Sequence, residues 1–281
     1  MSAFRRTNLP PLPLRVLVHA GVYLLAFTML FPFLWMVSTS LKTDKEAAES
    51  MALLPSSPQW GNYARAIRSA RLDEFYLNST LAAVVTMVLG VAHNALAGFA
   101  FAKMRFSGQR ALFLLTLATM MLPIQVSFIF AYVIANSLGY VNNLQAIVVP
   151  FLASGFGIYF MRQAIASVPD SLLEAGRMDG MNDFDLFWDL VRPTVWPSIS
   201  ALAIFTFVAS WNSFFWPLIV IDDLHRKTLP LAVADLAAGQ YIQSWPERMA
   251  AATILVGPLI LVFLLMQRAF VRGIALTGMK E

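Results

Sequence analysis

The sequence predicts an all-α integral membrane protein with six transmembrane helices, and three observations support this fold class. First, 58% of the 281 residues are hydrophobic and only 13% are charged, whereas a typical soluble domain is about one quarter charged. Second, charge-free runs separate the charged segments and are long enough to cross a bilayer, which takes about 20 apolar residues. Third, one charged segment, residues 170–192, is rich in acidic side chains and can form a connection outside the membrane.

Charge-free runs mark the spans, because an ionised side chain at the middle of a bilayer is costly. One run, 111–161, would be roughly 75 Å long as a single helix, which is more than two hydrocarbon cores of about 30 Å each. The turn-forming sequence ANSLGYVNN at 135–143 divides it into two spans. Six spans result from the runs 16–41, 75–102, 111–161, 193–221 and 249–267.

These spans divide the chain into two tails, a first helix, a loop and a helical core. The run in the first helix resembles a signal sequence, but it is too long for one and is interpreted as a retained span. The expected parts are a cytoplasmic tail at 1–15, the first transmembrane helix at 16–41, an extracytoplasmic loop at 42–74, a five-helix core at 75–268 with a cytoplasmic loop at 169–193, and a cytoplasmic tail at 269–281.

The distribution of basic residues predicts the orientation. An even number of spans places both termini on the same side of the membrane. That side carries twelve Lys and Arg residues, and the opposite side carries eight. Because connections rich in Lys and Arg tend to remain in the cytoplasm, both termini are expected to be cytoplasmic.

The loop 169–193 is expected to form a helical corner. Asp170 or Ser171 can cap a first helix at its start. Gly180 suits the left-handed turn that ends a helix, and Asn182 can cap a second helix. The loop is therefore predicted to be two short helices joined at a glycine.

The second helix of this corner is expected to be amphipathic, with acidic residues outside its apolar face. A loop lying on the membrane surface is the alternative, but such a helix usually carries Lys and Arg toward anionic lipids. The acidic residues instead favour a basic protein surface as the partner. At helical spacing, the apolar face would comprise Phe184, Phe187, Trp188 and Val191.

The sequence PDSLLEAGRMDGMNDFDLFWDLVRPTVWP, residues 169–197, resembles the E-A-A…G loop of binding-protein-dependent ABC importer permeases. The matching residues are Pro169, Leu172, Glu174, Ala175, Asp179, Gly180, Val191 and Pro193. Glycine replaces the second alanine of the pattern. The resemblance implies a type I ABC importer permease fold in which this loop is a coupling helix seated on a cytoplasmic ATPase. The ATPase-docking residues that it implies are Glu174, Ala175, Gly176, Asp179 and Gly180.

Other segments are similar to the carbohydrate-importer branch of these permeases. They are SPQWGNYARAI (57–67), LNSTLAAVVT (77–86), GFAFAKMRFSGQ (98–109), SWNSFFWPLIV (210–220) and MQRAFVRGI (266–274). The last is also similar to glycerol-3-phosphate permeases, so a phosphorylated polyol is an alternative solute. The resemblance thus implies import of a carbohydrate or related polyol by alternating access.

The same resemblance implies the partners and the location. They are a second permease subunit in a heterodimer, a cytoplasmic ABC ATPase dimer and an extracytoplasmic solute-binding protein, in the cytoplasmic (inner) membrane of a bacterium or archaeon. The chain lacks the G-x-x-x-x-G-K-[ST] loop that cradles ATP. We therefore expect ATP and Mg on the partner ATPase, and neither a cofactor nor a catalytic residue on this chain.

Four residues within the predicted spans are candidates for the solute path. Polar groups at membrane depth usually face a bundle interior or a water-filled cavity, and amides with aromatic faces suit the hydroxyls and C–H surfaces of sugars. The alternative is that each one hydrogen-bonds a neighbouring helix. The candidates are Asn212, Trp211, Gln125 and Asn94.

The loop at 222–248 is expected on the outer face, and the resemblance suggests that it contacts the solute-binding protein. Gly239, Gln240 and Tyr241 could reach into the cleft of that protein. An ordinary connection between spans is the alternative.

Other functional classes fit the sequence less well. A proton-coupled carrier needs carboxylates within its spans, but all 16 acidic residues lie outside the predicted ones. Sodium coupling through backbone carbonyls is less strongly excluded. The chain has no Cys, and its three His are far apart, so a metal site or membrane enzyme is not expected. Lys and Arg are nowhere concentrated, which argues against nucleic acid as a partner.

Overall fold

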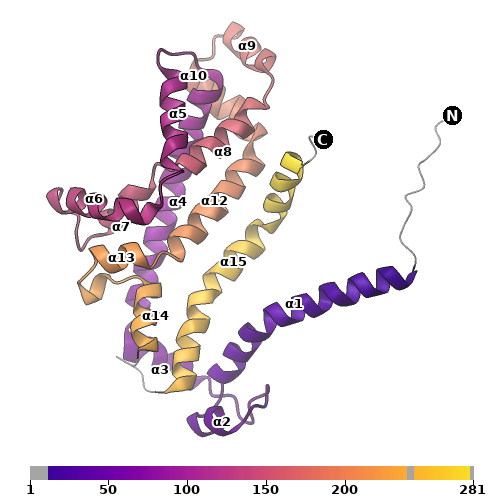
Figure 1. Ribbon diagram of the computed structural model, residues 1–281, viewed down its shortest axis with the longest axis vertical. Helices are drawn as coiled ribbons and strands as arrows, with labels where there is room; N and C mark the ends of the chain where they lie inside the picture. The colour runs from indigo at the N-terminus through magenta and orange to yellow at the C-terminus, as the bar shows by residue number, and fades with distance from the viewer. Residues whose placement is uncertain (1–11, 239–243, 279–281) are drawn as a thin grey trace.

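The computed structural model describes residues 12–238 and 244–278, and over these ranges every regular element is a helix (Figure 1). The three longest are α1 (Leu12–Ser40), α4 (Leu72–Lys103) and α15 (Trp245–Gly278). Between α4 and α15 lie α5 (Gln109–Thr119), α6 (Ile124–Ser137), α7 (Leu144–Val148), η1 (Val149–Phe151), α8 (Gly155–Ala166), α9 (Asp170–Met178), α10 (Asp183–Asp185), η2 (Leu186–Val191), α11 (Arg192–Thr194), α12 (Trp196–Trp211), α13 (Phe215–Val220), η3 (Leu224–Arg226) and α14 (Leu229–Ala237). Two short helices, α2 (Asp44–Glu49) and α3 (Gly61–Ala70), follow α1.

The predicted all-helical membrane fold is confirmed. In the described residues, α1, α4 and α15 are each long and apolar enough to cross a membrane alone. Three bent pairs pass the same test together: α5 with α6, α7–η1 with α8, and the α10–α11 segment with α12. The structure therefore has up to six spans if each bent pair counts as one.

Three of the predicted spans are not single helices, and one of them, after the turn at 135–143, bends by 44° between α7–η1 and α8. The span beginning at 111 breaks where α5 ends at Thr119 and α6 begins after Pro123, with a bend of 105°. Proline lacks an N–H and disfavours the helical conformation of the residue before it, so the helix stops there. As a result α6 projects sideways from the bundle (Figure 1). The span 193–221 is likewise divided, between α12 and α13.

The helix α4 is the central element of the bundle and packs against both α8 and α12. A side-chain carbon added at Gly98 would lie only 2.7 Å from the Cβ atom of Met161. Glycine therefore lets the backbones of α4 and α8 approach closely, as small residues do between membrane helices. The buried cluster around this contact includes Phe99, Leu173 and Phe187, so the 169–193 corner packs on the ends of α4 and α8.

Helix α1 diverges from the rest of the molecule (Figure 1). Only its end is fastened: Asn62 on α3 donates hydrogen bonds to the carbonyls of Ser40 and Lys42 at 2.7 and 2.9 Å. Its apolar side chains, such as Leu24 and Phe27, are exposed over most of its length. In a membrane, this helix offers a long apolar surface to lipid or to another membrane subunit.

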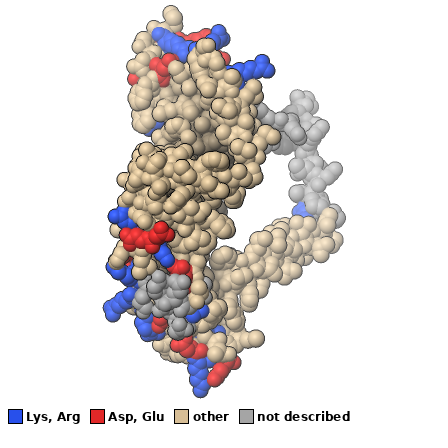
Figure 2. All heavy atoms as spheres, turned by 60° about the vertical axis from the view of Figure 1, so that its left-hand side comes forward, with Lys and Arg blue, Asp and Glu red and all other residues tan. Residues whose placement is uncertain are grey.

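Charged side chains gather at one end of the molecule and over the opposite half as far as its middle, and the band between these two groups is almost entirely uncharged (Figure 2). The corner with α9 lies at one end, and α2 and α3 lie at the other (Figure 1). This distribution agrees with a bilayer around the uncharged band, because charged groups are costly inside the hydrocarbon.

Candidate functional site

The first candidate site is the helical corner between α8 and α12. Helix α9 ends as predicted, with Gly180 in the left-handed region at φ 86°. The Met181 N–H donates to the Gly176 carbonyl at 3.0 Å, and the Gly180 N–H donates to the Arg177 carbonyl at 3.1 Å. These two bonds form a Schellman turn that satisfies the last carbonyls of the helix.

The predicted cap of the first helix by Asp170 or Ser171 is wrong, because α9 begins at Asp170 directly after Pro169 and has no side-chain cap. The second helix of the corner starts as predicted. The Asn182 side chain accepts hydrogen bonds from the N–H groups of Phe184 and Asp185, at 2.9 and 3.0 Å. The Asp185 carboxylate accepts in return from the Asn182 N–H at 3.3 Å. This reciprocal capping box fixes the direction in which the second helix leaves the turn.

Gly176, which replaces alanine in the family pattern, lies where the two helices of the corner touch. A side-chain carbon there would lie 2.6 Å from Leu186 Cδ2 and 2.9 Å from Leu190 Cδ1. Both leucine side chains would have to move to admit it. Gly176 is therefore a packing residue in the crease of the corner, and it is buried rather than presented to a partner.

The other predicted docking residues lie on the outside of this crease. Glu174, Ala175, Asp179 and Gly180 are all exposed. Leu173 on the opposite face of α9 is buried against the bundle. The corner thus holds a rigid, partly acidic surface away from the membrane helices.

The predicted apolar face of the second helix is partly wrong. Phe187 and Val191 are buried as expected, but Phe184 and Trp188 are exposed and stack on each other with ring centroids 6.0 Å apart. The reason is that η2 is a π-helical turn, whose wider winding changes which residues share a face. Leu186 turns inward instead and is fully buried.

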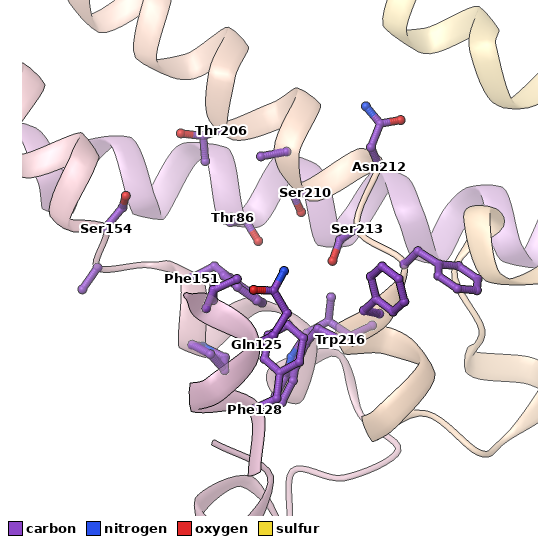
Figure 3. Close-up of a pocket in the computed structure, with 17 residues that line it drawn as sticks. Thr86, Gln125, Phe128, Phe151, Ser154, Thr206, Ser210, Asn212, Ser213 and Trp216 are labelled. Carbon is purple, nitrogen blue, oxygen red and sulfur yellow. The ribbon is translucent and has the colours of Figure 1, made fainter. Parts of the chain in front are cut away.

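The second candidate site is a cavity of about 520 Å³ between the two charged ends of the bundle (Figure 3). Its walls come from α4, α6, the α7–η1–α8 segment and the α12–α13 break. The polar side chains that line it are uncharged. They are Thr86, Gln125, Ser154, Thr206, Ser210, Asn212 and Ser213. Aromatic residues complete the lining, among them Phe128, Phe151 and Trp216.

Two of the four predicted path residues line this cavity. Gln125 is the second residue of α6, just after the proline break, and its side chain points into the cavity (Figure 3). Asn212 lies at the end of α12, where the chain breaks before α13. The side-chain amides of Gln125 and Asn212 thus both lie next to breaks in the predicted spans, where the chain departs from helical conformation.

The other two predicted path residues do not line this cavity, and each bonds a neighbouring segment. Trp211 is 1% exposed, donates its indole N–H to the Leu255 carbonyl at 3.0 Å, and does not line the cavity. Asn94 is also buried, and its side-chain oxygen accepts from the Ser154 N–H at 3.0 Å. Each hydrogen-bonds a neighbouring segment, which is the alternative expected for polar residues between membrane helices.

Sequence reasoning missed Thr86, which lines the cavity from α4. Its residue is 2% exposed, and its hydroxyl has no hydrogen-bond partner among the described residues. Thr80 on the same helix instead donates to the carbonyl four residues earlier, that of Tyr76, at 2.8 Å. A threonine hydroxyl in an apolar helix usually bonds the carbonyl one turn earlier. The sequence therefore gave no indication that the Thr86 hydroxyl does not.

The predicted contact residues for a solute-binding protein, Gly239, Gln240 and Tyr241, lie outside the described residues. Their contact with a solute-binding protein stays a prediction.

Comparison with known proteins decides the family. A family model described as "Binding-protein-dependent transport system inner membrane component" matches residues 94–276. The chain belongs to this family. The resemblance drawn from the 169–197 sequence is confirmed.

Relatives match along almost the whole chain. The chain is 28% identical over 268 residues to the "Arabinooligosaccharides transport system permease protein AraQ" of Halalkalibacterium halodurans, covering 94% of this chain and 96% of the relative. It is also 28% identical over 269 residues to the "sn-glycerol-3-phosphate transport system permease protein UgpE" of Pectobacterium atrosepticum, covering 93% and 96%.

The fold also matches a solved structure. A bacterial ABC transporter involved in the import of the acidic polysaccharide alginate contains a chain that superposes with a TM-score of 0.81 at 22% identity. The match covers 94% of this permease and 100% of that chain, and it shows the type I importer permease fold. This chain is therefore a permease component of a binding-protein-dependent transport system.

Proposed function

We propose that this permease carries a carbohydrate or related polyol across the cytoplasmic membrane by alternating access, after a solute-binding protein delivers it. The relatives named for arabinooligosaccharides and sn-glycerol-3-phosphate support this solute class. The observation that carries the proposal is the combination of an exposed acidic corner at one end with an uncharged polar cavity between the ends.

The energy for transport comes from a separate ABC ATPase that binds ATP and Mg and docks on the corner. Glu174, Ala175, Asp179 and Gly180 are exposed on the outer face of this corner and form the docking surface. Gly176 supports docking from behind, because it lets α9 lie close against Leu186 and Leu190. A carboxylate such as Glu174 suits a basic side chain of the ATPase.

A second permease subunit completes the membrane part of the transporter. The long exposed apolar side of α1 is a surface that the second permease subunit and the lipid can cover. Both termini are proposed to lie in the cytoplasm, because Lys and Arg are in excess on that side. The outer loop residues Gly239, Gln240 and Tyr241 are proposed to contact the solute-binding protein.

The solute contacts this chain in the cavity through Gln125, Asn212 and the Thr86 hydroxyl. Thr86 comes from α4, Gln125 from α6 and Asn212 from the C-cap of α12. Figure 3 shows aromatic side chains beside Gln125, while the Asn212 amide is directed away from them. Neutral donors and acceptors match the hydroxyl groups of a sugar, and aromatic rings can pack on its C–H faces. A buried hydroxyl without a partner is costly, and a solute hydroxyl would relieve that cost.

The test is uptake into vesicles that contain the complete complex and the cognate binding protein. A panel of labelled lactose, arabinooligosaccharide, glycerol-3-phosphate and alginate oligosaccharide would identify the solute class. We expect uptake of a member of this panel to require ATP inside the vesicles and to continue without an ion gradient. Uptake driven by a sodium or proton gradient without ATP would instead identify a secondary carrier and contradict the proposal.

A further inference from the structure

A polar contact from the Lys103 side chain joins the end of α4 to the elbow between α8 and α9, beside the buried packing of Val168 and Phe99. The Lys103 ammonium donates to the Val168 carbonyl and to the Asp170 carboxylate, each at 2.6 Å. The Lys103 side chain is only 6% exposed, whereas that of Asp170 is 76% exposed. Lys103 therefore reaches from the bundle to the first residue of the coupling helix and is covered along its length.

This contact is intact at neutral pH. The hydrogen bond from Lys103, together with its positive charge, holds the pKa of Asp170 below the usual range of a carboxyl group. Asp170 therefore stays ionised, and paired with Lys103, at neutral pH. The ion pair is lost only when the pH falls below the lowered pKa of Asp170.

The helices on either side of the elbow extend from this contact to the cavity. Helix α4 packs against α8 at Gly98, and Asn94 holds the Ser154 N–H at the start of α8. Thr86 on α4 and Ser154 at the start of α8 both line the cavity. A displacement of α9 that reaches Lys103 therefore acts on both walls through closely packed helices.

We propose that Lys103 is a positioning residue that transmits movement of the coupling helix into the α4–α8 pair and so to the cavity. This inference rests on the proposed function, because it requires an ATPase docked on the corner. The buried side chains of Val168 and Leu173 already pack in one cluster with Phe99 of α4. The Lys103 contact adds a polar tie at the first residue of α9, and it keeps the first turn of α9 in step with α8 and α4 when the corner moves.

The absence of cysteine from the chain allows a direct test. Ala209, which lines the cavity, is replaced by cysteine as a reporter. The complete complex in vesicles is labelled with a membrane-impermeant maleimide in two parallel samples, one with Mg-ATP and one with Mg-ADP plus vanadate. The rate of labelling is measured on this chain. With Lys103 present, we expect the labelling rate to differ between the two nucleotide conditions.

In Lys103→Met, the ATPase should remain associated and active, while the nucleotide-dependent difference in labelling should shrink by about threefold or more. Lys103→Arg should retain most of the difference, because it keeps the charge and the donors. Asp170→Asn should lose only part of it, because the Val168 contact remains. Arg110→Met, at an exposed position on α5, serves as the control that should behave as the unmodified chain.

An unchanged labelling difference in Lys103→Met would overturn the transmission role and leave the proposed function standing. Loss of the ATPase from Lys103→Met would also overturn it, because Lys103 would then support docking. If the Ala209→Cys reporter with Lys103 unchanged shows the same labelling rate in both nucleotide conditions, the proposed function and the transmission role are both overturned.

Discussion

At the residue scale, the buried Thr86 hydroxyl in the wall of the cavity gives a test of the proposed solute contact. Because that hydroxyl has no partner among the described residues, Thr86→Val removes it without breaking a bond. We expect unchanged or slightly higher thermal stability, but solute affinity lower by up to roughly tenfold. Thr80→Val on the same helix is the matched control, since its hydroxyl bonds only the Tyr76 carbonyl. Equal transport affinity in both variants would contradict the assignment.

A second residue-scale prediction concerns Gly176. A larger side chain cannot fit beside Leu186 and Leu190, so Gly176→Leu should destabilise the corner by about 1–3 kcal/mol. The midpoint of thermal unfolding of the purified protein measures this effect. Ala175→Leu, one residue away on the exposed side of α9, should leave the midpoint nearly unchanged. The interpretation of Gly176 as a packing residue fails if the two variants are equally stable.

The residues that were predicted well are those whose local sequence determines their role. The cap at Asn182 and the left-handed turn at Gly180 depend on side chains within a few positions, so spacing alone identifies them. The roles of Trp211 and Asn94 depend on the Leu255 carbonyl and the Ser154 N–H, which only the folded chain brings near. Composition can place a polar residue in a span, but it cannot choose between a helix partner and a cavity.

At the element scale, breaks in helices account for both the success and the errors of the predicted spans. Charge-free runs locate the membrane segments because charge is costly in lipid, but they do not show where a segment bends. The bend before α6 and the break after α12 place Gln125 and Asn212 at the cavity. Pro123 gave a local signal for the first, whereas the π-helical turn of η2 has no comparable signal in its sequence.

The winding of η2 gives a prediction at this scale. Phe187 is buried, while Phe184 is exposed, although a regular helix places them on one face. Phe187→Ala should therefore lower the free energy of unfolding by about 3–5 kcal/mol, and Phe184→Ala by less than about 1 kcal/mol. Denaturant unfolding of the two variants compares these costs. Equal losses would indicate a regular helix in place of the π-helical turn.

At the scale of the whole molecule, α4, α8 and the corner form one continuous packed body. Buried side chains of the corner pack in the same cluster as Phe99 of α4 and Met161 of α8. The cavity lies farther along the same helices. A force applied at the corner can therefore reach the cavity by movement of packed helices, and no long flexible connection interrupts the route over these residues.

The most direct test of this account is whether the exposed corner receives the ATPase. The double variant Glu174→Lys with Gly180→Val reverses the charge and strains the turn at φ 86°. Glu49→Lys, on α2 at the opposite end, is the charge-matched control. After normal membrane insertion, the amount of ATPase that co-purifies with each protein is measured together with ATP-driven solute uptake. We expect the double variant to lose both and the control to keep both. Full ATPase association and uptake in the double variant would contradict the account.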